Sequence, residues 1–187
     1  MKHCIFLIAC CSILLLSCPS EAQVKDGATE ADDREAVFAG KFYPGEKGEL
    51  KASLNKYFSQ ATGKQTDVPV AALIAPHAGY PYSGKVAAAA YKQLDPEHRY
   101  KNIFIIAPSH RVSFEGASIY HKGDYTTPLG KVKVNRELAE KLVRENEIFV
   151  FNPSAHSQEH SLEVQLPFLQ HHLQQDFQIV PIVTGTQ

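Results

Sequence analysis

The stretch KNIFIIAPSHR, residues 101–111, decides the fold class that this sequence predicts. It joins an unbroken apolar run to a proline and then to His110. A short apolar run without alternation is typical of a parallel strand that is buried on both faces. We therefore expect a buried strand over residues 101–107, followed by a loop that carries His110 past the carboxyl end of the strand.

Two further apolar runs have the same character. VPVAALIA, residues 68–75, leads into Pro76 and His77, and FQIVPIVTG spans residues 177–185. The segments around these runs carry apolar residues at helical spacing, over residues 46–61, 84–94, 135–147 and 159–174. Alternation of helices with buried strands predicts an α/β fold with a mainly parallel sheet flanked by helices.

Local residues predict how three of these helices begin. Ser83 is expected to cap the helix over residues 84–94, and Asn135 the helix over residues 135–147. Pro167 is expected either to kink the last helix or to mark its first turn.

The first 22 residues have the pattern of a signal peptide. A basic start precedes an apolar stretch over residues 5–16 that is too short to span a bilayer. Two processing sites fit: LLSC, residues 15–18, resembles a bacterial lipobox and would place a lipid on Cys18, whereas SEAQ would allow cleavage before Gln23. We expect an exported protein, in the first case a membrane-anchored lipoprotein of the periplasm or cell surface and in the second a secreted one.

The rest of the chain is divided by composition. Residues 23–35 are polar and predict a flexible tether, and residues 36–187 form the predicted domain. All four cysteines lie within residues 1–18, so this domain has neither a disulfide nor a thiolate ligand. A formal net charge of −1 over 187 residues gives no indication of a nucleic-acid partner, and membrane contact is expected only through the signal or a lipid.

Two histidines are expected at one edge of the sheet. His77 and His110 each follow an apolar run and a proline, and ligands of such sheets bind beyond the carboxyl ends of the strands. Neutral imidazoles are common transition-metal ligands, so the pair predicts half of a metal site, although each could also be a hydrogen-bonded structural residue. Tyr80 and Tyr82 could offer hydroxyl groups to a substrate or could serve in packing.

A third cluster, AHSQEHSLE, covers residues 155–163. His156 and His160 are four residues apart, as are Glu159 and Glu163, so each pair could share a helix face. Glu159 or His160 could act as an acid or base, or could orient one of the other histidines from outside a metal site. Helix capping and solvent exposure are the alternative interpretation of the cluster.

Five motifs together resemble one known family. REAVFAGKFYPG, LIAPHAGYPYSG, IFIIAPSHR, YTTPLGKVKVN and EHSLEVQLPFLQ are similar, in this order, to the Memo family, whose bacterial members are often called protein B of the AmmeMemoRadiSam system. The resemblance implies a fold similar to the LigB-type class III extradiol dioxygenases. It also implies that His77 and His110 match the two metal-holding histidines, that His160 and Glu159 are candidate catalytic residues, and that the metal is Fe(II) or copper.

The sequence departs from the family pattern in two ways. Family members continue beyond the run at residues 177–185, so the resemblance implies an incomplete fold, an N-terminal part of a Memo-like domain whose third metal ligand lies outside this chain. An exported protein would also not meet the cytoplasmic radical-SAM partner of that system.

Three functions therefore stand as hypotheses. The first is binding of a metal, a small molecule or a peptide without catalysis. The second is an oxidoreductase of the extradiol dioxygenase type that uses non-haem iron or copper. The third is a truncated fragment without function. The sequence does not indicate an oligomeric state.

Overall fold

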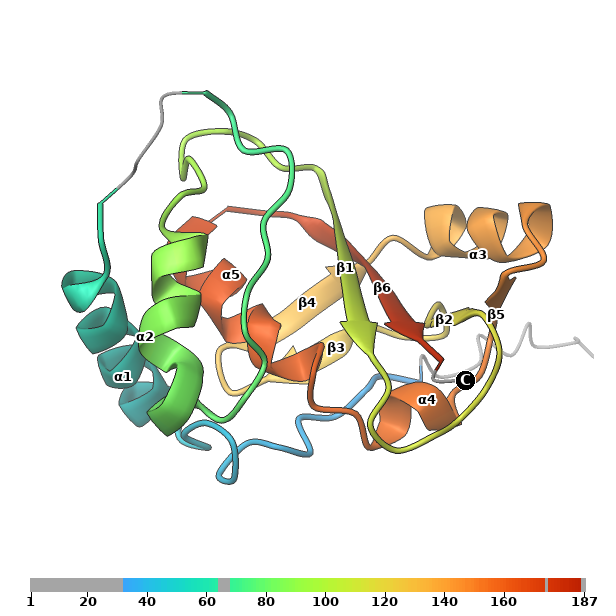
Figure 1. Ribbon diagram of the computed structural model, residues 1–187, viewed down its shortest axis with the longest axis horizontal. Helices are drawn as coiled ribbons and strands as arrows, with labels where there is room; N and C mark the ends of the chain where they lie inside the picture. Colours follow the sequence, from blue (N-terminus) through green and yellow to red (C-terminus); the bar gives the residue numbers. More distant parts are fainter. Residues whose placement is uncertain (1–31, 64–67, 174, 186–187) are drawn as a thin grey trace, which may run out of the picture. The chain divides into compact units, whose positions relative to one another are not determined.

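The computed structural model describes residues 32–63, 68–173 and 175–185 (Figure 1). The predicted signal peptide, Cys18 and residues 23–31 of the predicted tether lie outside these residues. Within the described part, none of the helices combines the length and the apolar character that a membrane span requires.

The sheet is organised around one strand, β6 (Gln178–Thr184). Strand β1 (Asn102–Pro108) pairs with it in parallel over its whole length, from Asn102 opposite Gln178 to Pro108 opposite Thr184. The short strand β4 (Gly130–Val134) pairs in parallel with the start of β6, and β2 (Ala117–Ile119) pairs antiparallel with its end. Because β1 occupies one edge of β6 throughout, β2 and β4 share the other edge.

Two further short strands extend the sheet. Strand β3 (Tyr125–Thr127) is antiparallel to β4, and β5 (Phe149–Val150) is parallel to β2. Three strand pairings among the described residues are parallel and two are antiparallel. The predicted α/β class is confirmed, and the sheet that the helices flank is a mixed one.

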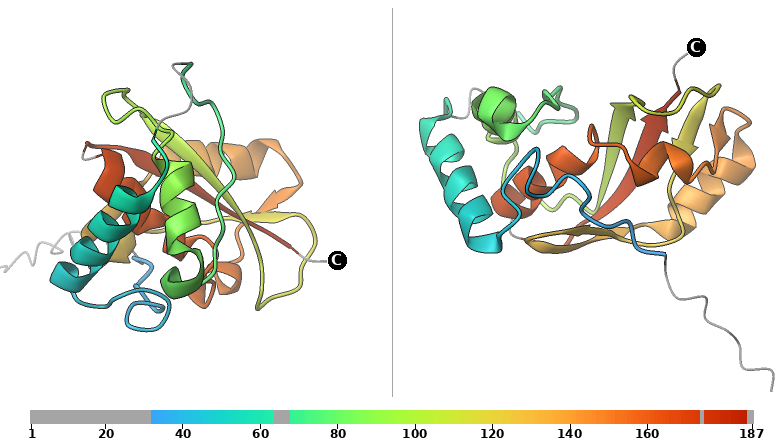
Figure 2. Two further views of the ribbon diagram at one scale, coloured as in Figure 1. Left: turned by 60° about the vertical axis from the view of Figure 1, so that its left-hand side comes forward. Right: turned by 90° about the horizontal axis from the view of Figure 1, so that it is seen from below.

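Helices cover both faces of β6 because its side chains alternate between two apolar clusters. Ile179 and Val183 belong to the main core, which also contains buried residues of α1 (Lys47–Gln60), α2 (Tyr80–Tyr91) and α5 (Leu166–Leu173). Val180 and Ile182 belong to a second cluster that α3 (Arg136–Glu145) covers with Ala139. Figures 1 and 2 show α1 and α2 on one side of the β1–β6 pair and α3 on the other.

Two of the three predictions about how helices begin are confirmed. Asn135 caps α3, with its side-chain oxygen accepting the N–H of Leu138, and Pro167 lies in the first turn of α5. The prediction that Ser83 caps a helix is wrong, because α2 begins at Tyr80 after Gly79. Pro81 in the first turn favours this earlier start, since its fixed φ suits a helix and its missing N–H is not needed there. The Ser83 hydroxyl donates instead to the carbonyl of Ala78.

The predicted strand over residues 68–75 is wrong. This run forms no strand, and Ile74 is 98% exposed. Ala71, Ala72 and Ala75 add little buried area on pairing, whereas the β-branched residues of β6 offer β1 a much larger apolar surface. The prediction of burial on both faces is confirmed for β6 and wrong for β1, where Ile105 and Ala107 are buried but Phe104 is 52% and Ile106 70% exposed. In the run at residues 68–75, Val70, Leu73 and Ala75 pack partly against the main core without joining the sheet.

Removing the α3 cap should destabilise the domain. In Asn135→Ala the N–H of Leu138 loses its acceptor, and the amide donor to Asn102 is lost as well. We expect the free energy of unfolding, measured by urea denaturation, to fall by about 1 kcal/mol. Asn135→Asp keeps the capping oxygen and should cost less, so equal losses in the two variants would contradict the cap as the cause.

Candidate metal centre

Three histidine rings from separate segments meet beyond the carboxyl end of β1. His110 follows β1, His77 precedes α2, and His160 lies between the short helix α4 (Ser154–Ser157) and the 3₁₀ turn at Glu163–Gln165. The ring centroid of His110 is 5.2 Å from that of His77 and 4.6 Å from that of His160, and the remaining pair is 6.1 Å apart. The structure thus brings both predicted metal ligands and His160 into one place.

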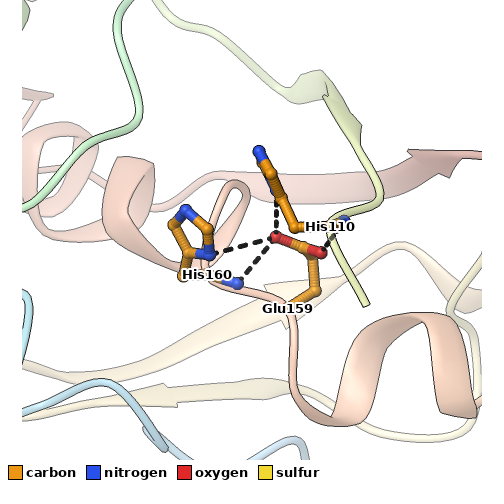
Figure 3. A group of neighbouring side chains, drawn as sticks. All are labelled: His110, Glu159 and His160. Carbon is orange, nitrogen blue, oxygen red and sulfur yellow. Dashed lines mark hydrogen bonds and ion pairs between the residues drawn. The ribbon is translucent and has the colours of Figure 1, made fainter. Parts of the chain in front are cut away.

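The buried carboxylate of Glu159 connects two of these histidines. Its Oε2 accepts the N–H of His110 at 2.6 Å, and its Oε1 accepts the N–H groups of His160 and Ser161, each at 2.9 Å. The same Oε1 lies 3.0 Å from Nδ1 of the His110 ring and 3.4 Å from Nδ1 of the His160 ring (Figure 3). His110, Glu159 and His160 therefore form a group that could bind a metal ion.

The charge states in this group suit a metal. Burial would by itself raise the pKa of Glu159, but the N–H groups of Ser161 and His110, with the His110 ring, outweigh it and lower that pKa to about 2. Burial lowers the pKa of His77 and of His160 below the usual value, because desolvation disfavours the charged ring. An ionised carboxylate beside neutral imidazoles is the protonation state in which these side chains bind metals.

Hydrogen bonding decides which ring nitrogen of His110 is free. An ionised Glu159 can only accept, so the hydrogen pattern assigns the proton of His110 to Nδ1 and leaves the lone pair on Nε2. Figure 3 shows the outer ring nitrogens of His110 and His160 pointing to the same side, away from the carboxylate. Nδ1 of His160 is buried and faces Oε1 of Glu159 at 3.4 Å, without a hydrogen bond to any other described residue. The carboxylate therefore faces the inner nitrogen of both rings, and the outer nitrogens are the ones that could bind a metal.

Arg34 and Glu163 hold the segment that carries Glu159. Both side chains are buried and form an ion pair. Arg34 also donates to the carbonyl of His156 at 2.9 Å and to that of Glu159 at 2.8 Å. Glu163 accepts the hydroxyl of Tyr43 at 2.6 Å on its other oxygen. Arg34 thereby fixes the backbone that leads to Glu159 and His160.

The prediction of shared helix faces in residues 155–163 is wrong. Helix α4 ends at Ser157, and the backbone turns before the next helical residue, Glu163. Glu159 therefore points to the histidine cluster while Glu163 pairs with Arg34, and both are buried rather than solvated. Many long-range hydrogen bonds to this segment replace the helical ones that the four-residue spacing suggested.

His156 belongs to a separate buried network. The Ser118 hydroxyl accepts the N–H of Asn152 at 2.9 Å and donates to the carbonyl of the same residue at 3.1 Å. The Nε2 of His156, 3.0 Å from that hydroxyl, therefore carries the ring proton, and Nδ1 accepts the hydroxyl of Tyr125 at 2.8 Å. The ring of His156 thus holds the segment before Glu159 against Ser118 and Tyr125, and it is not part of the candidate metal group.

The two tyrosines near His77 lie in different surroundings. Tyr80 is buried, and its hydroxyl donates to the carbonyl of Val164 at 3.0 Å. Tyr82 is 89% exposed on α2. A substrate contact by either residue stays a prediction.

A groove reaches the centre from one side. It has a volume of about 430 Å³, runs between residues 70–75 and β1, and is lined by His77 together with apolar side chains such as Leu94 and Phe104. The side chain of His110 is 39% exposed. A small molecule can therefore approach the histidine cluster from solvent.

Comparison with known proteins agrees with this arrangement of motifs. Residues 34–187 match the family described as Memo-like protein. The chain belongs to the Memo family. It is 40% identical over 159 residues to a MEMO1 family protein of Saccharolobus islandicus. The matched region covers 80% of this chain and 56% of that relative.

Relatives from the genus Pyrococcus give the same result. MEMO1 family proteins of Pyrococcus abyssi and Pyrococcus furiosus are 39% and 38% identical to this chain, covering 82% of it in both cases. The chain spans about half the length of these curated relatives, 54% and 53% respectively. The sequence predicted His77 and His110 as metal ligands with a third ligand outside the chain. The group whose ligand atoms lie close enough to share one ion is His110, Glu159 and His160, and a metal contact by His77 stays a prediction.

Breaking the buried ion pair should destabilise the domain strongly. Glu163→Gln keeps the shape of the side chain but leaves Arg34 as an unpaired buried charge. We expect the free energy of unfolding in urea to fall by about 3–5 kcal/mol. Lys131→Gln, which removes the exposed partner of Asp33, is the matched control and should change stability little. Similar losses in both variants would show that burial of the pair does not matter.

The network around His156 should make stability depend on pH. Burial lowers the pKa of His156 to about 3, so below the usual value of about 6.5 only the unfolded chain binds this proton. The contribution of His156 to the free energy of unfolding is therefore fully present above pH 6.5. It is lost as the pH falls toward 3, by up to about 1.4 kcal/mol per pH unit. Other groups titrate in this range, so the measurement is the difference in slope between the wild type and His156→Gln. If the free energy of unfolding changed with pH in the same way in the wild type and in His156→Gln, the buried neutral state of His156 would not be the cause of the pH dependence.

Proposed function

We propose that this Memo-family chain binds a transition-metal ion through the imidazoles of His77, His110 and His160. The observation that carries the proposal is the convergence of these rings, with centroids between 4.6 and 6.1 Å apart, from three separate segments. Three rings of one chemistry at one edge of a sheet match the donor set of first-row transition metals better than that of Mg²⁺ or Ca²⁺, which prefer oxygen. Fe(II) and copper are the candidate ions.

Glu159 acts in this proposal as the group that orients His110. Its two oxygens already accept three backbone N–H groups and contact the His110 ring, which leaves little capacity for direct coordination. A carboxylate that receives the second ring N–H of a metal-bound histidine fixes the tautomer and raises the basicity of the ligand. Glu159 therefore supports the centre from just outside it.

A bound metal would supply a Lewis-acid or redox centre at the end of the apolar groove. The groove and the exposed edge of His110 support binding of a small apolar molecule beside that centre. We propose ligand binding there as the function that the geometry supports best.

An oxidoreductase of the extradiol dioxygenase type is the second candidate. The observation in its favour is access, because the groove leads from solvent to His77. In this candidate His77 and His110 would hold the metal with a ligand from outside this chain, and His160, not bound to the metal, would exchange a proton with the substrate. Oxygen uptake by the iron-loaded protein with catechol would support this candidate, and its absence under conditions where iron is retained would leave binding alone.

Loss of single histidines tests the metal centre. We expect His77→Ala, His110→Ala and His160→Ala each to weaken Co(II) binding by more than about 100-fold in isothermal titration calorimetry, since each removes a ligand of a three-ligand site. Glu159→Gln should weaken it by about 10- to 100-fold. The control is His98→Ala, an exposed histidine that packs on Tyr100 outside the centre.

The outcomes separate the two possible ligand sets. Equal Co(II) affinity in the wild type and all three alanine variants would remove the site. If Glu159→Gln lost as much affinity as His110→Ala while His77→Ala retained it, the carboxylate would be the third ligand in place of His77.

A further inference from the structure

A second hollow lies at the opposite end of the central strands. It has a volume of about 1000 Å³ and is lined by residues of α1, of the loop before β1, of β4 and of the segment before β6. Lys101 precedes β1 and lines this cavity, whereas His110 follows the same strand. Seven residues of strand span about 23 Å, so the cavity is separate from the histidine cluster.

Positive charge is concentrated around this cavity. Its lining holds six lysine and arginine side chains and one carboxylate, that of Asp176; the six are Lys47, Lys51, Arg99, Lys101, Lys131 and Lys133. The chain as a whole has a formal net charge of −1. The cluster is therefore a local feature and does not follow from a basic composition.

Most of this charge is not neutralised within the protein. Lys131 pairs with Asp33 and Lys133 with Asp124. The other four cations form no ion pair with any residue that the structure describes; they are Lys47, Lys51, Arg99 and Lys101. Like charges gathered at one concave surface repel one another and attract an anion.

The fold brings these cations together from distant positions. Lys47 and Lys51 are one helical turn apart on α1, and Lys131 and Lys133 are two residues apart on β4, where the intervening Val132 is buried. Each pair therefore lies on one face of its element. The convergence of two such faces on one cavity is a property of the tertiary structure.

We propose that this cavity binds a phosphorylated small molecule of about nucleotide size that carries two or more phosphate groups. Four cations that form no ion pair with a described residue outnumber the one carboxylate of the lining, that of Asp176, and match more than one phosphate. The guanidinium of Arg99 suits bidentate phosphate contact. The side-chain amide of Asn55 lines the same cavity and can hydrogen-bond to a hydroxyl group or a base. The amides of Gln170 and Gln175 also line it, but Gln170 already bonds to Thr127 and Gly130, and Gln175 to His98. A hollow at the upper end of the usual range for small-molecule sites favours such a ligand over an extended polymer or a membrane.

Binding of ATP in the presence of EDTA tests the proposal. We expect calorimetry at low salt to show saturable binding of ATP and of tripolyphosphate but not of adenosine, with an affinity that falls as salt is added. Lys51→Glu and Arg99→Glu should each weaken ATP binding by about tenfold or more. Both residues are exposed, so circular dichroism should show unchanged folding.

A matched control lies on the same helix. Lys56 is an exposed residue of α1 that does not line the cavity, and Lys56→Glu should change ATP affinity by less than about twofold. An equal loss in Lys56→Glu, or no saturable binding of either phosphate probe, would overturn the proposal. Binding to vesicles of anionic lipid that needs Lys51 and Arg99, without ATP binding, would also overturn it in favour of a membrane surface. His110→Ala should bind ATP normally, because the two sites are separate.

Discussion

The buried ion pair between Arg34 and Glu163 ties the segment around Arg34 to the segment that carries Glu159 and His160. An unpaired charge at such a place costs several kcal/mol, so the two segments must stay together in the folded state. Arg34 also donates to the carbonyls of His156 and Glu159 and so determines the path of the backbone between them. The position of the Glu159 carboxylate, and with it the orientation of His110, depends on this contact across more than 120 residues of sequence.

The sheet adds a second constraint and separates the two sites. Full-length parallel pairing with β6 sets the direction in which the chain leaves β1, and Glu159 then holds both the backbone and the ring of His110. The histidine cluster lies beyond the carboxyl end of β1, and the basic cavity lies at its amino end. The two sites share a scaffold and have no residue in common, so the chemistry of one does not require the other.

The sequence pattern predicted the helices that local residues stabilise and the strands that are strongly apolar. Periodicity indicated α1 and α3, the Asn135 cap followed from residue type, and β1 and β6 followed from their apolar runs. The short strands β2 to β5 were missed because pairing stabilises them more than their own composition, although the alternation in GKVKV was an available signal for β4. The run at residues 68–75 misled the prediction, because apolar composition does not say which segment will pair with a given strand edge.

The sequence by itself determined the α/β class, the resemblance to the Memo family, and the expectation that His77 and His110 meet at one edge of the sheet. These conclusions need only the order of apolar runs and the motifs that follow them. Only the tertiary structure decided that Glu159 and Glu163 serve different partners, that His160 joins the cluster, and that lysines of α1 and β4 surround one cavity. These arrangements depend on hydrogen bonds and charges between residues that are far apart in the chain. Such residues become neighbours only when the whole domain has folded.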